Sequence, residues 1–539
     1  MMNAACSAWC PMSSPARSAT RATVLIATLV ATIAQAQPSI ERSAVLDAMK
    51  RATRFMVETV STEGGYVWAY LPDRSRRWGE MEARESMIWI QPPGTPTMGH
   101  LFLDAYHATR DEYYYSAAQK VAAALIKGQH PSGGWNYMVD FAGERSLAEW
   151  YATIGRNGWR LEEFQHHWGN ATFDDAGTAE SAKFLLRLYL EKRSDQYKRP
   201  LDAAIRFVLD SQHPIGGWPQ RYPRGSVLRD EGKTDYTGYL TFNDDVAAEN
   251  IDFLVTCYQS LGDKRLLDPI RRGMDAFVKL QHPLPQAGWA LQYTPDLLPA
   301  GARTYEPRAL VTHTTAANVE SLLRFHRLTG DATFLARIAD ALHWLDSVAL
   351  TPEVAAIAGG GRTHPTFVEL ESNRPLYVHR TGSNVVNGRY FVDYDPKHTI
   401  GHYSAFRRID TAGLRRRLDA ARVMTPEAAS KDSALLAPGG TVPLPRFFTV
   451  TPAAPSTSAA DVIASLNAEG FWLAPLGYNT HRYKAPGAKT VAPGDFGQTH
   501  VGDEFDTSPF PDPGLKGISI EAYVRNMGVL IRQLSDARP

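Results

Sequence analysis

The sequence of 539 residues has few cysteines, no excess of charge of either sign and no apolar run long enough to span a membrane. Three cysteines in so long a chain exclude a scaffold held together by disulfides. The 57 basic residues equal the 57 acidic ones, which argues against a nucleic-acid-binding protein that needs a strongly basic surface. A hydrophobic fraction of 44% excludes general disorder. The composition therefore indicates a globular protein with a well-filled core, and we expect an enzyme.

The N-terminus has the pattern of a secretory signal peptide. Arg17 and Arg21 precede the apolar run 23–34, and Ala34-Gln35-Ala36 then matches an A-x-A cleavage pattern. A buried N-terminal helix is the alternative. We expect cleavage after Ala36 and a secreted or periplasmic protein without a membrane span. Removing residues 1–36 leaves 55 basic against 57 acidic residues and one cysteine, Cys257, which we expect to be a buried, inert thiol.

One motif recurs along the chain at a spacing typical of helical hairpins. QHPSGGW at 129–135 returns as QHPIGGW at 212–218 and, more loosely, as QHPLPQAGW at 281–289. Apolar residues at helical spacing lie between the copies, and proline and glycine end each helix. We therefore predict an all-α fold, an α/α toroid in which helical hairpins form an incomplete barrel. The tryptophans are expected to cover the hairpin ends, or alternatively to stack on sugar rings.

Two acidic clusters precede segments that are expected to be helical. TFDD at 172–175 and TFNDD at 241–245 are nearly the same sequence motif in neighbouring repeats. Each aspartate pair could cap its helix, since carboxylates accept hydrogen bonds from free N–H groups there. The repetition suggests instead that both clusters present carboxylates to one cleft. Carboxylate and amide oxygens are ligands suited to Ca²⁺.

Several motifs together resemble the family 10 pectate lyases. The resemblance covers roughly residues 130 to 410, with the motifs in the family's order. The matching motifs are GGWPQ-x-YP at 216–223, TFNDD at 241–245, TFDD at 172–175, ARTYE at 302–306, Glu369 with NRPL at 373–376, and Arg380.

The resemblance implies an α/α toroid that cleaves polygalacturonate by β-elimination with Ca²⁺. It implies that Asp174 and Asp244 hold the calcium ion, with Asp245 beside them as a further ligand, and that Arg303 is the Brønsted base. Five residues are candidates for substrate binding: Arg380, Asn373, Arg374, Asn243 and Trp218.

Elimination requires loss of the C5 proton, which lies α to a carboxylate. Calcium on that carboxylate would stabilise the enolate-like intermediate. Arginine is protonated in water, so we expect desolvation and neighbouring positive charge to lower the pKa of Arg303. Activity should then rise toward alkaline pH. The alternative for Arg303 is an ion pair with Glu306, and for Arg380 it is plain surface exposure.

The chain departs from the family pattern along one wall of the expected cleft. Thr366 stands where the family pattern has an arginine, His379-Arg380-Thr381-Gly382 replaces GRDG, and Asp175 replaces an asparagine. The calcium and base residues are retained. The departures leave open whether the substrate is pectate or another polyuronate, and whether the lyase activity is impaired.

We expect four parts in the chain: the signal peptide at 1–36, extra N-terminal hairpins at 37–128, the lyase-like toroid at 129–424, and a Pro/Gly-rich, irregular extension at 425–539 that ends in a helix packed on the core. The predicted function is that of a monomeric, secreted, Ca²⁺-dependent lyase acting on an anionic polysaccharide, with no nucleic-acid or membrane partner. A toroidal glycoside hydrolase using paired carboxylates and a non-catalytic carbohydrate-binding toroid are the alternatives.

Overall fold

The structure is a computed structural model that describes residues 41–155, 161–224, 235–381, 389–397, 399, 402–435, 457–477 and 514–536. The predicted signal peptide lies outside the described residues. Within them, no helix is long and apolar enough to cross a membrane.

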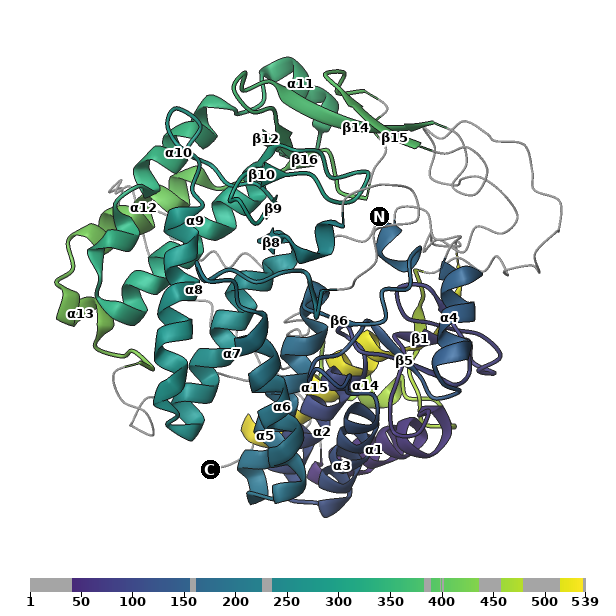
Figure 1. Cartoon of the computed structure of the whole chain (residues 1–539). Helices are drawn as coiled ribbons and strands as arrows, with labels where there is room; N and C mark the ends of the chain where they lie inside the picture. The colour runs from purple at the N-terminus through teal and green to yellow at the C-terminus, as the bar shows by residue number, and fades with distance from the viewer. Residues whose placement is uncertain are drawn as a thin grey trace, which may run out of the picture.

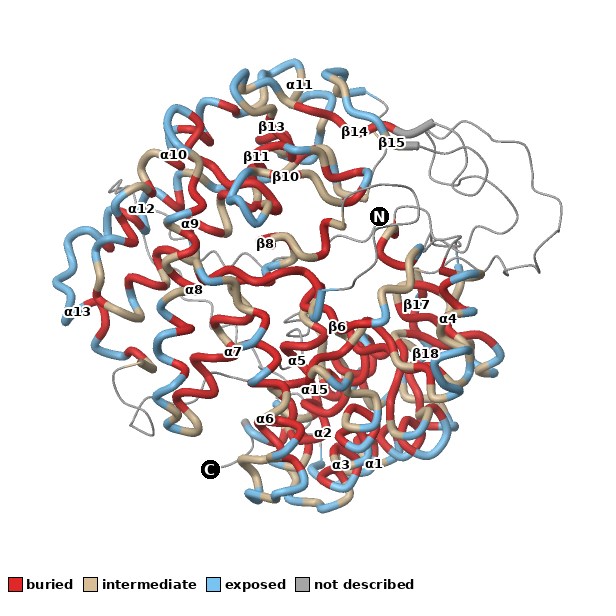
Figure 2. Tube along the Cα trace, in the orientation of Figure 1, coloured by how far each residue is buried: buried red, intermediate tan, exposed pale blue. Residues whose placement is uncertain are grey.

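Four helical hairpins follow one another around an arc, as Figure 1 shows. They are α2–α3 (Thr95–Thr109 and Glu112–Lys127), α5–α6 (Gly177–Lys192 and Asp195–Ser211), α7–α8 (Val246–Leu261 and Leu267–Lys279) and α9–α10 (Thr312–Thr329 and Ile338–Ser347). The first helix of each hairpin is buried over much of its surface, whereas the second buries one amphipathic face (Figure 2). The hairpins therefore form an inner and an outer layer, and the predicted all-α toroid is confirmed.

The remaining helices cover the ends and edges of this arc. They are α1 (Arg42–Phe55), α4 (Glu144–Ala152), α11 (Pro352–Ala358), α12 (Thr411–Arg422), α13 (Pro426–Ser430), α14 (Ala459–Ala464) and α15 (Ile520–Asp536). Cys257 is buried on α7, as predicted, and burial raises the pKa of its thiol.

The repeated QHP turns join consecutive outer helices. Their glutamines stand at the ends of α3, α6 and α8, and each Nε2 donates a hydrogen bond to a carbonyl at the start of the next outer helix. The pairs are Gln129 to Pro200 at 3.0 Å, Gln212 to Pro269 at 2.9 Å and Gln281 to Arg337 at 3.2 Å. The repeat therefore encodes the stacking of one hairpin on the next.

The tryptophans of the same turns are structural. Each indole N–H donates to a carbonyl of the preceding outer helix at 2.8 Å: Trp135 to Leu125, Trp218 to Val208 and Trp289 to Phe277. All three side chains are fully buried. The prediction that Trp218 binds substrate is therefore wrong, because its ring has no face open to a sugar.

Short antiparallel strands precede the inner helices and mark one end of the toroid. β6 (Ala171–Thr172) and β8 (Leu240–Thr241) lead into the turns before α5 and α7, and β11 (Leu310–Val311) leads directly into α9. Their partners are β7 (Arg221–Tyr222) for β6, β9 (Gln292–Tyr293) for β8, and β13 (Phe367–Val368) for β11. The sheets extend through β10 (Pro299–Ala300), β14 (Pro375–Thr381) and β15 (Arg389–Asp393). A further pair joins β12 (His364–Pro365) to β16 (Phe406–Arg407), and another joins β4 (Met87–Trp89) to β5 (Met138–Asp140).

The two terminal parts of the described chain pack together. β18 (Lys516–Ser519) lies between β1 (Ala69–Tyr70) and β17 (Leu473–Pro475), and the same sheet continues from β1 through β2 (Arg77–Trp78) to β3 (Glu82–Ala83). Helix α15 packs on α2, α1 and α14.

The extension also contains a further copy of the hairpin turn. The indole N–H of Trp472 donates to the carbonyl of Val462 at 2.8 Å, the ten-residue separation found for Trp135 and Trp218. The described part of this extension is therefore more regular than its composition indicated.

Candidate active site

The two aspartate turns have the same backbone conformation. In the first turn Asp175 and Ala176 have φ values of 50° and 59°, and in the second Asp244 and Asp245 have φ values of 49° and 56°. Left-handed backbone costs a non-glycine residue about 1–2 kcal/mol, so each turn stores strain at two successive positions. Neither turn caps its helix with a side chain. Capping does not explain the aspartates.

Asp174 is the most enclosed carboxylate of the site. It is fully buried, and its Oδ2 accepts hydrogen bonds from the hydroxyl of Tyr137 at 2.5 Å, Nε2 of Gln220 at 2.8 Å and Nη2 of Arg303 at 2.5 Å. Burial favours protonation, but Arg303 and the hydrogen bonds together hold the pKa of Asp174 below its ordinary value. Its Oδ1 is buried without an N–H or hydroxyl donor among the described residues.

Arg303 is surrounded by three carboxylates. Besides Asp174, its Nη1 lies 2.9 Å from Oε1 of Glu306, and its Nε lies 3.3 Å from Oε2 of Glu163. The ion pair with Glu306 that we considered as an alternative is therefore present. Burial lowers the pKa of Arg303, but Asp174 and the other acids outweigh this effect and hold the pKa well above its usual range. The expected lowering of this pKa is wrong for the ligand-free site, because its neighbours are anions.

Asp244 and Asp175 lie in a cluster of acids whose mutual repulsion Arg303 does not offset. The carboxyl groups of Asp174 and Asp244 lie within hydrogen-bonding reach of each other. Burial and the charges of Asp174 and Asp175 raise the pKa of Asp244 well above its ordinary value. Burial and Asp174 likewise raise the pKa of Asp175 to about 7. The cluster therefore holds protons that a bound cation would displace.

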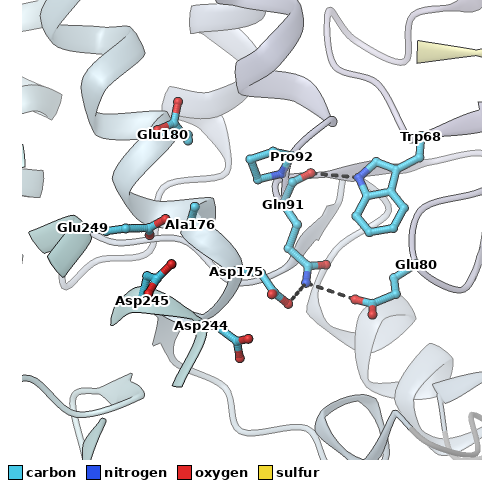
Figure 3. Close-up of a pocket in the computed structure, with 10 residues that line it drawn as sticks. All are labelled: Trp68, Glu80, Gln91, Pro92, Asp175, Ala176, Glu180, Asp244, Asp245 and Glu249. Atoms are coloured by element: carbon cyan, nitrogen blue, oxygen red, sulfur yellow. Dashed lines mark hydrogen bonds between the residues drawn. The ribbon is translucent and has the colours of Figure 1, made fainter. Parts of the chain in front are cut away.

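The cluster fits a hard cation in its chemistry. Asp174 and Asp244 offer oxygen ligands, and the unpartnered Oδ1 of Asp174 is free to coordinate. Within the described ranges, no group of three or more His, Cys, Asp or Glu side chains is arranged to hold a metal ion. A calcium ion at this pair would take its other ligands from water, carbonyl groups or substrate. Asp245 lies on the side of Glu249, apart from Asp244 (Figure 3), so of the three predicted ligands the structure brings two together.

A cavity of about 360 Å³ opens beside this cluster, as Figure 3 shows. Its lining comprises Trp68, Glu80, Gln91, Pro92, Asp175, Ala176, Glu180, Asp244, Asp245 and Glu249. The N-terminal part of the chain supplies four of these residues. Nε2 of Gln91 donates both to Oδ2 of Asp175 at 2.6 Å and to Oε2 of Glu80 at 3.1 Å, and so links the two carboxyl groups. The segment between α1 and α2 therefore forms one wall of the acidic site.

Asn243 belongs to an interior network that orders the site. It is buried, and its Nδ2 donates to Oδ2 of Asp244 at 2.5 Å and to the hydroxyl of Tyr403 at 2.9 Å. The Tyr403 hydroxyl donates to Oε1 of Glu306 at 2.8 Å, the atom that also binds Arg303. Asn243 therefore positions Asp244 and connects it to the arginine, rather than facing a substrate.

The other predicted substrate-binding residues lie on the NRP segment and on β14. Oδ1 of Asn373 accepts hydrogen bonds from Gln286 at 2.8 Å and Trp344 at 2.9 Å, which ties the segment to the toroid. Arg374 is exposed, and its guanidinium lies 3.3 Å from the ring centre of Tyr394. Arg380 is part of β14, and its side chain lies outside the described part of the chain.

Four residues of the site were missed by sequence reasoning, namely Glu163, Tyr137, Tyr403 and Glu80. Glu163 accepts a hydrogen bond from Tyr305 at 2.8 Å, and burial raises its pKa to about 7. None of these residues lies in a repeated motif, so no local sequence pattern indicated that they belong to the site.

Residues 149–395 match the family model of pectic acid lyases. The predicted resemblance is confirmed. The prediction of a lyase enzyme is confirmed with it. The matched segment contains Asp174, Asp244 and Arg303, whereas Glu80 and the strand β16 lie outside it. No curated protein matches the chain.

Solved structures of related shape include several carbohydrate-active enzymes. A variant of the family 10 polysaccharide lyase from Cellvibrio cellulosa, in complex with trigalacturonic acid, is 18% identical, with 60% of this chain and 97% of that chain covered and a TM-score of 0.39. Cellobiose 2-epimerase from Spirochaeta thermophila is 12% identical, with 92% and 96% covered and a TM-score of 0.40. The GH76A α-1,6-mannanase from Salegentibacter sp. is 11% identical, with 92% and 98% covered and a TM-score of 0.33.

Proposed function

We propose that this protein is a secreted, Ca²⁺-dependent polysaccharide lyase that cleaves polygalacturonate or a related polyuronate by β-elimination. The observation that carries the proposal is the buried Arg303 beside the carboxyl pair of Asp174 and Asp244. The match to pectic acid lyases and the A-x-A pattern after the N-terminal apolar run add support.

The acid pair is suited to hold calcium next to the reacting sugar. Bound there, Ca²⁺ would neutralise the uronate carboxylate and make the C5 proton more acidic. Tyr137 and Gln220 hold Asp174 in place through its Oδ2 and leave Oδ1 available. Asn243 fixes the orientation of Asp244 through Oδ2.

Arg303 is the proposed base. Its proton is held most strongly by the charge of Asp174, more than by Glu306 or Glu163. A cation that engages the charge of Asp174 would weaken the strongest of the attractions that hold this proton, and would thereby lower the pKa of Arg303. Its Nη then accepts the C5 proton, the bond from C4 to the glycosidic oxygen breaks, and a C4–C5 double bond forms. The leaving oxygen takes its proton from water.

The hydrolase alternative is disfavoured by the spacing of the same carboxylates. Glycosidases separate their two carboxyl groups by about 5–9.5 Å to accommodate the sugar or a water. The carboxyl groups of Asp174 and Asp244 are within hydrogen-bonding reach, which is closer than either hydrolytic mechanism requires. A non-catalytic binding protein would have no need for the buried base.

The proposal is tested by incubating the purified protein with polygalacturonate and other polyuronates, with calcium and with chelator. We expect an ultraviolet-absorbing unsaturated product that disappears with the chelator. Arg303→Ala and Arg303→Lys should each lose at least about 100-fold in rate, while Arg308→Ala, at an exposed arginine nearby, should keep wild-type activity. Thermal unfolding checks that the variants fold. Absence of the product on every polyuronate, or full activity of a folded Arg303→Ala, would refute the proposal.

A further inference from the structure

Arg407 is a half-buried arginine on β16, near enough to Asp244 for the two charges to interact. Its Nε donates a hydrogen bond to Oγ1 of Thr366 at 3.2 Å, and its guanidinium lies 6.0 Å from the ring centre of Tyr403. Tyr403 in turn contacts Glu306 and Asn243. The Arg407 guanidinium is therefore connected to the Arg303 network through a single side chain.

The charge of Arg407 is not neutralised by a close carboxylate. Arg303 has three acids at ion-pair distance, but across the part of the chain that the structure describes no Asp or Glu lies within 4.0 Å of the Arg407 guanidinium. Burial lowers the pKa of Arg407, and the more distant charges of Tyr403 and Asp244 do not offset this. A half-buried cation without an anion is costly. Such a group is explained most simply by an anion that arrives with a ligand.

Arg407 lies beside a departure noted in the sequence. Thr366 occupies the place where the family pattern has an arginine, and the structure buries its side chain completely. β12 and β16 pair with His364 opposite Arg407 and Pro365 opposite Phe406. The guanidinium of Arg407 therefore lies beside the side chain at position 366, although Arg407 comes 41 residues later in the chain and outside the segment that matches the lyase family.

We propose that Arg407 binds a carboxylate of the polyuronate substrate and thereby selects acidic over esterified sugar units. The inference rests on the proposed function for the identity of the substrate. Because Nε is held by Thr366, the two Nη groups remain to form paired hydrogen bonds with a carboxylate. Tyr403, whose ring centre lies 6.0 Å from the guanidinium, connects Arg407 to Glu306 and Arg303.

The test is equilibrium binding of oligogalacturonate and of its methyl ester by calorimetry, together with steady-state kinetics. We expect Arg407→Gln to weaken oligogalacturonate binding at least about tenfold and to raise KM more than it lowers kcat. Wild-type protein should prefer the acid over the ester, and Arg407→Gln should lose most of that preference. Arg407→Lys should retain part of it. Arg408→Gln is the matched control, because the adjacent side chain is exposed and bonds to the carbonyl of Gly360.

The outcomes separate this inference from the proposed function. If wild-type protein makes unsaturated product and a folded Arg407→Gln keeps its affinity and acid preference, the inference fails and the function stands. If wild-type protein binds oligogalacturonate through Arg407 but forms no product, the function fails and the inference stands. If wild-type protein binds no polyuronate, both fail. Thermal unfolding of each variant confirms that lost binding is not lost structure.

Discussion

The acidic cluster predicts that Asp175→Asn makes the protein more stable at alkaline pH and leaves its stability nearly unchanged in acid. The pKa of Asp175 is raised from 3.8 to about 7 by burial and by Asp174. Between these values the folded protein holds a proton that the unfolded chain releases. Stability must therefore fall as the pH rises through this window, and the loss is complete above about pH 7.

The size of the effect follows from the same shift. A rise of about three pKa units corresponds to about 4 kcal/mol, at about 1.4 kcal/mol per unit. Asp175 is only partly buried and shares its charge interactions with Asp174 and Asp244, so we expect about half of that value. Asparagine removes the charge but keeps an oxygen that can accept the hydrogen bond from Gln91. The variant should thus gain about 2 kcal/mol at pH 8.

The assay is urea unfolding at about pH 4 and at about pH 8 in the presence of chelator, with Asp296→Asn as the control. Asp296 is exposed, so its variant should match wild type at both pH values. An equal stability difference for Asp175→Asn at the two pH values, or a loss of stability at the alkaline one, would show that folding does not raise the pKa of Asp175.

Three further predictions follow from the fold and the site. Calcium should raise the Tm of wild-type protein at pH 8 and should release protons when it binds. The proton release is measured by calorimetry in buffers of different ionisation enthalpy. Asp244→Asn should lose most of both effects. Gly216→Ala should lower the free energy of unfolding by at least about 3 kcal/mol, because φ is 113° and a Cβ would overlap the carbonyl of Arg272. Gly262→Ala is the control: its φ is 71° and the space around it is open, so it should cost about 1 kcal/mol in the same denaturant titration. Trp218→Phe should lower Tm without changing the affinity for oligogalacturonate, since the indole is buried and bonds to the backbone; a selective loss of affinity would restore its role in binding.

The parts of the fold that could be predicted from sequence are those in which one short motif makes its own contacts. In the QHP turns, glutamine and tryptophan bond to the backbone of adjacent outer helices, so the same residues reappear wherever the same junction is built. The aspartate turns were found for a similar reason, since each precedes an inner helix with the same left-handed backbone. Repetition made both visible without an alignment.

The site residues that were missed depend on contacts between distant segments. Glu80 reaches Asp175 through Gln91, and Arg407 reaches the wall of Thr366 through strand pairing. No local pattern distinguishes such residues from ordinary surface charges. The expected lowering of the pKa of Arg303 considered burial and positive neighbours, whereas the folded chain surrounds the guanidinium with acids.

These long-range contacts give the site two walls of opposite charge. Asp174, Asp175 and Asp244 form an acidic wall whose mutual repulsion Arg303 does not offset, so that it retains protons, whereas Arg407 retains a positive charge with no carboxylate at ion-pair distance among the described residues. A polyuronate approaching the acidic wall alone would be repelled, and a neutral polysaccharide would leave the Arg407 guanidinium uncompensated. A polyanion accompanied by a divalent cation satisfies both walls at once, because the cation binds the acids and a neighbouring carboxylate binds the arginine. The zero net charge of the chain thus conceals a local separation of charge that only a substrate and a metal ion together would balance.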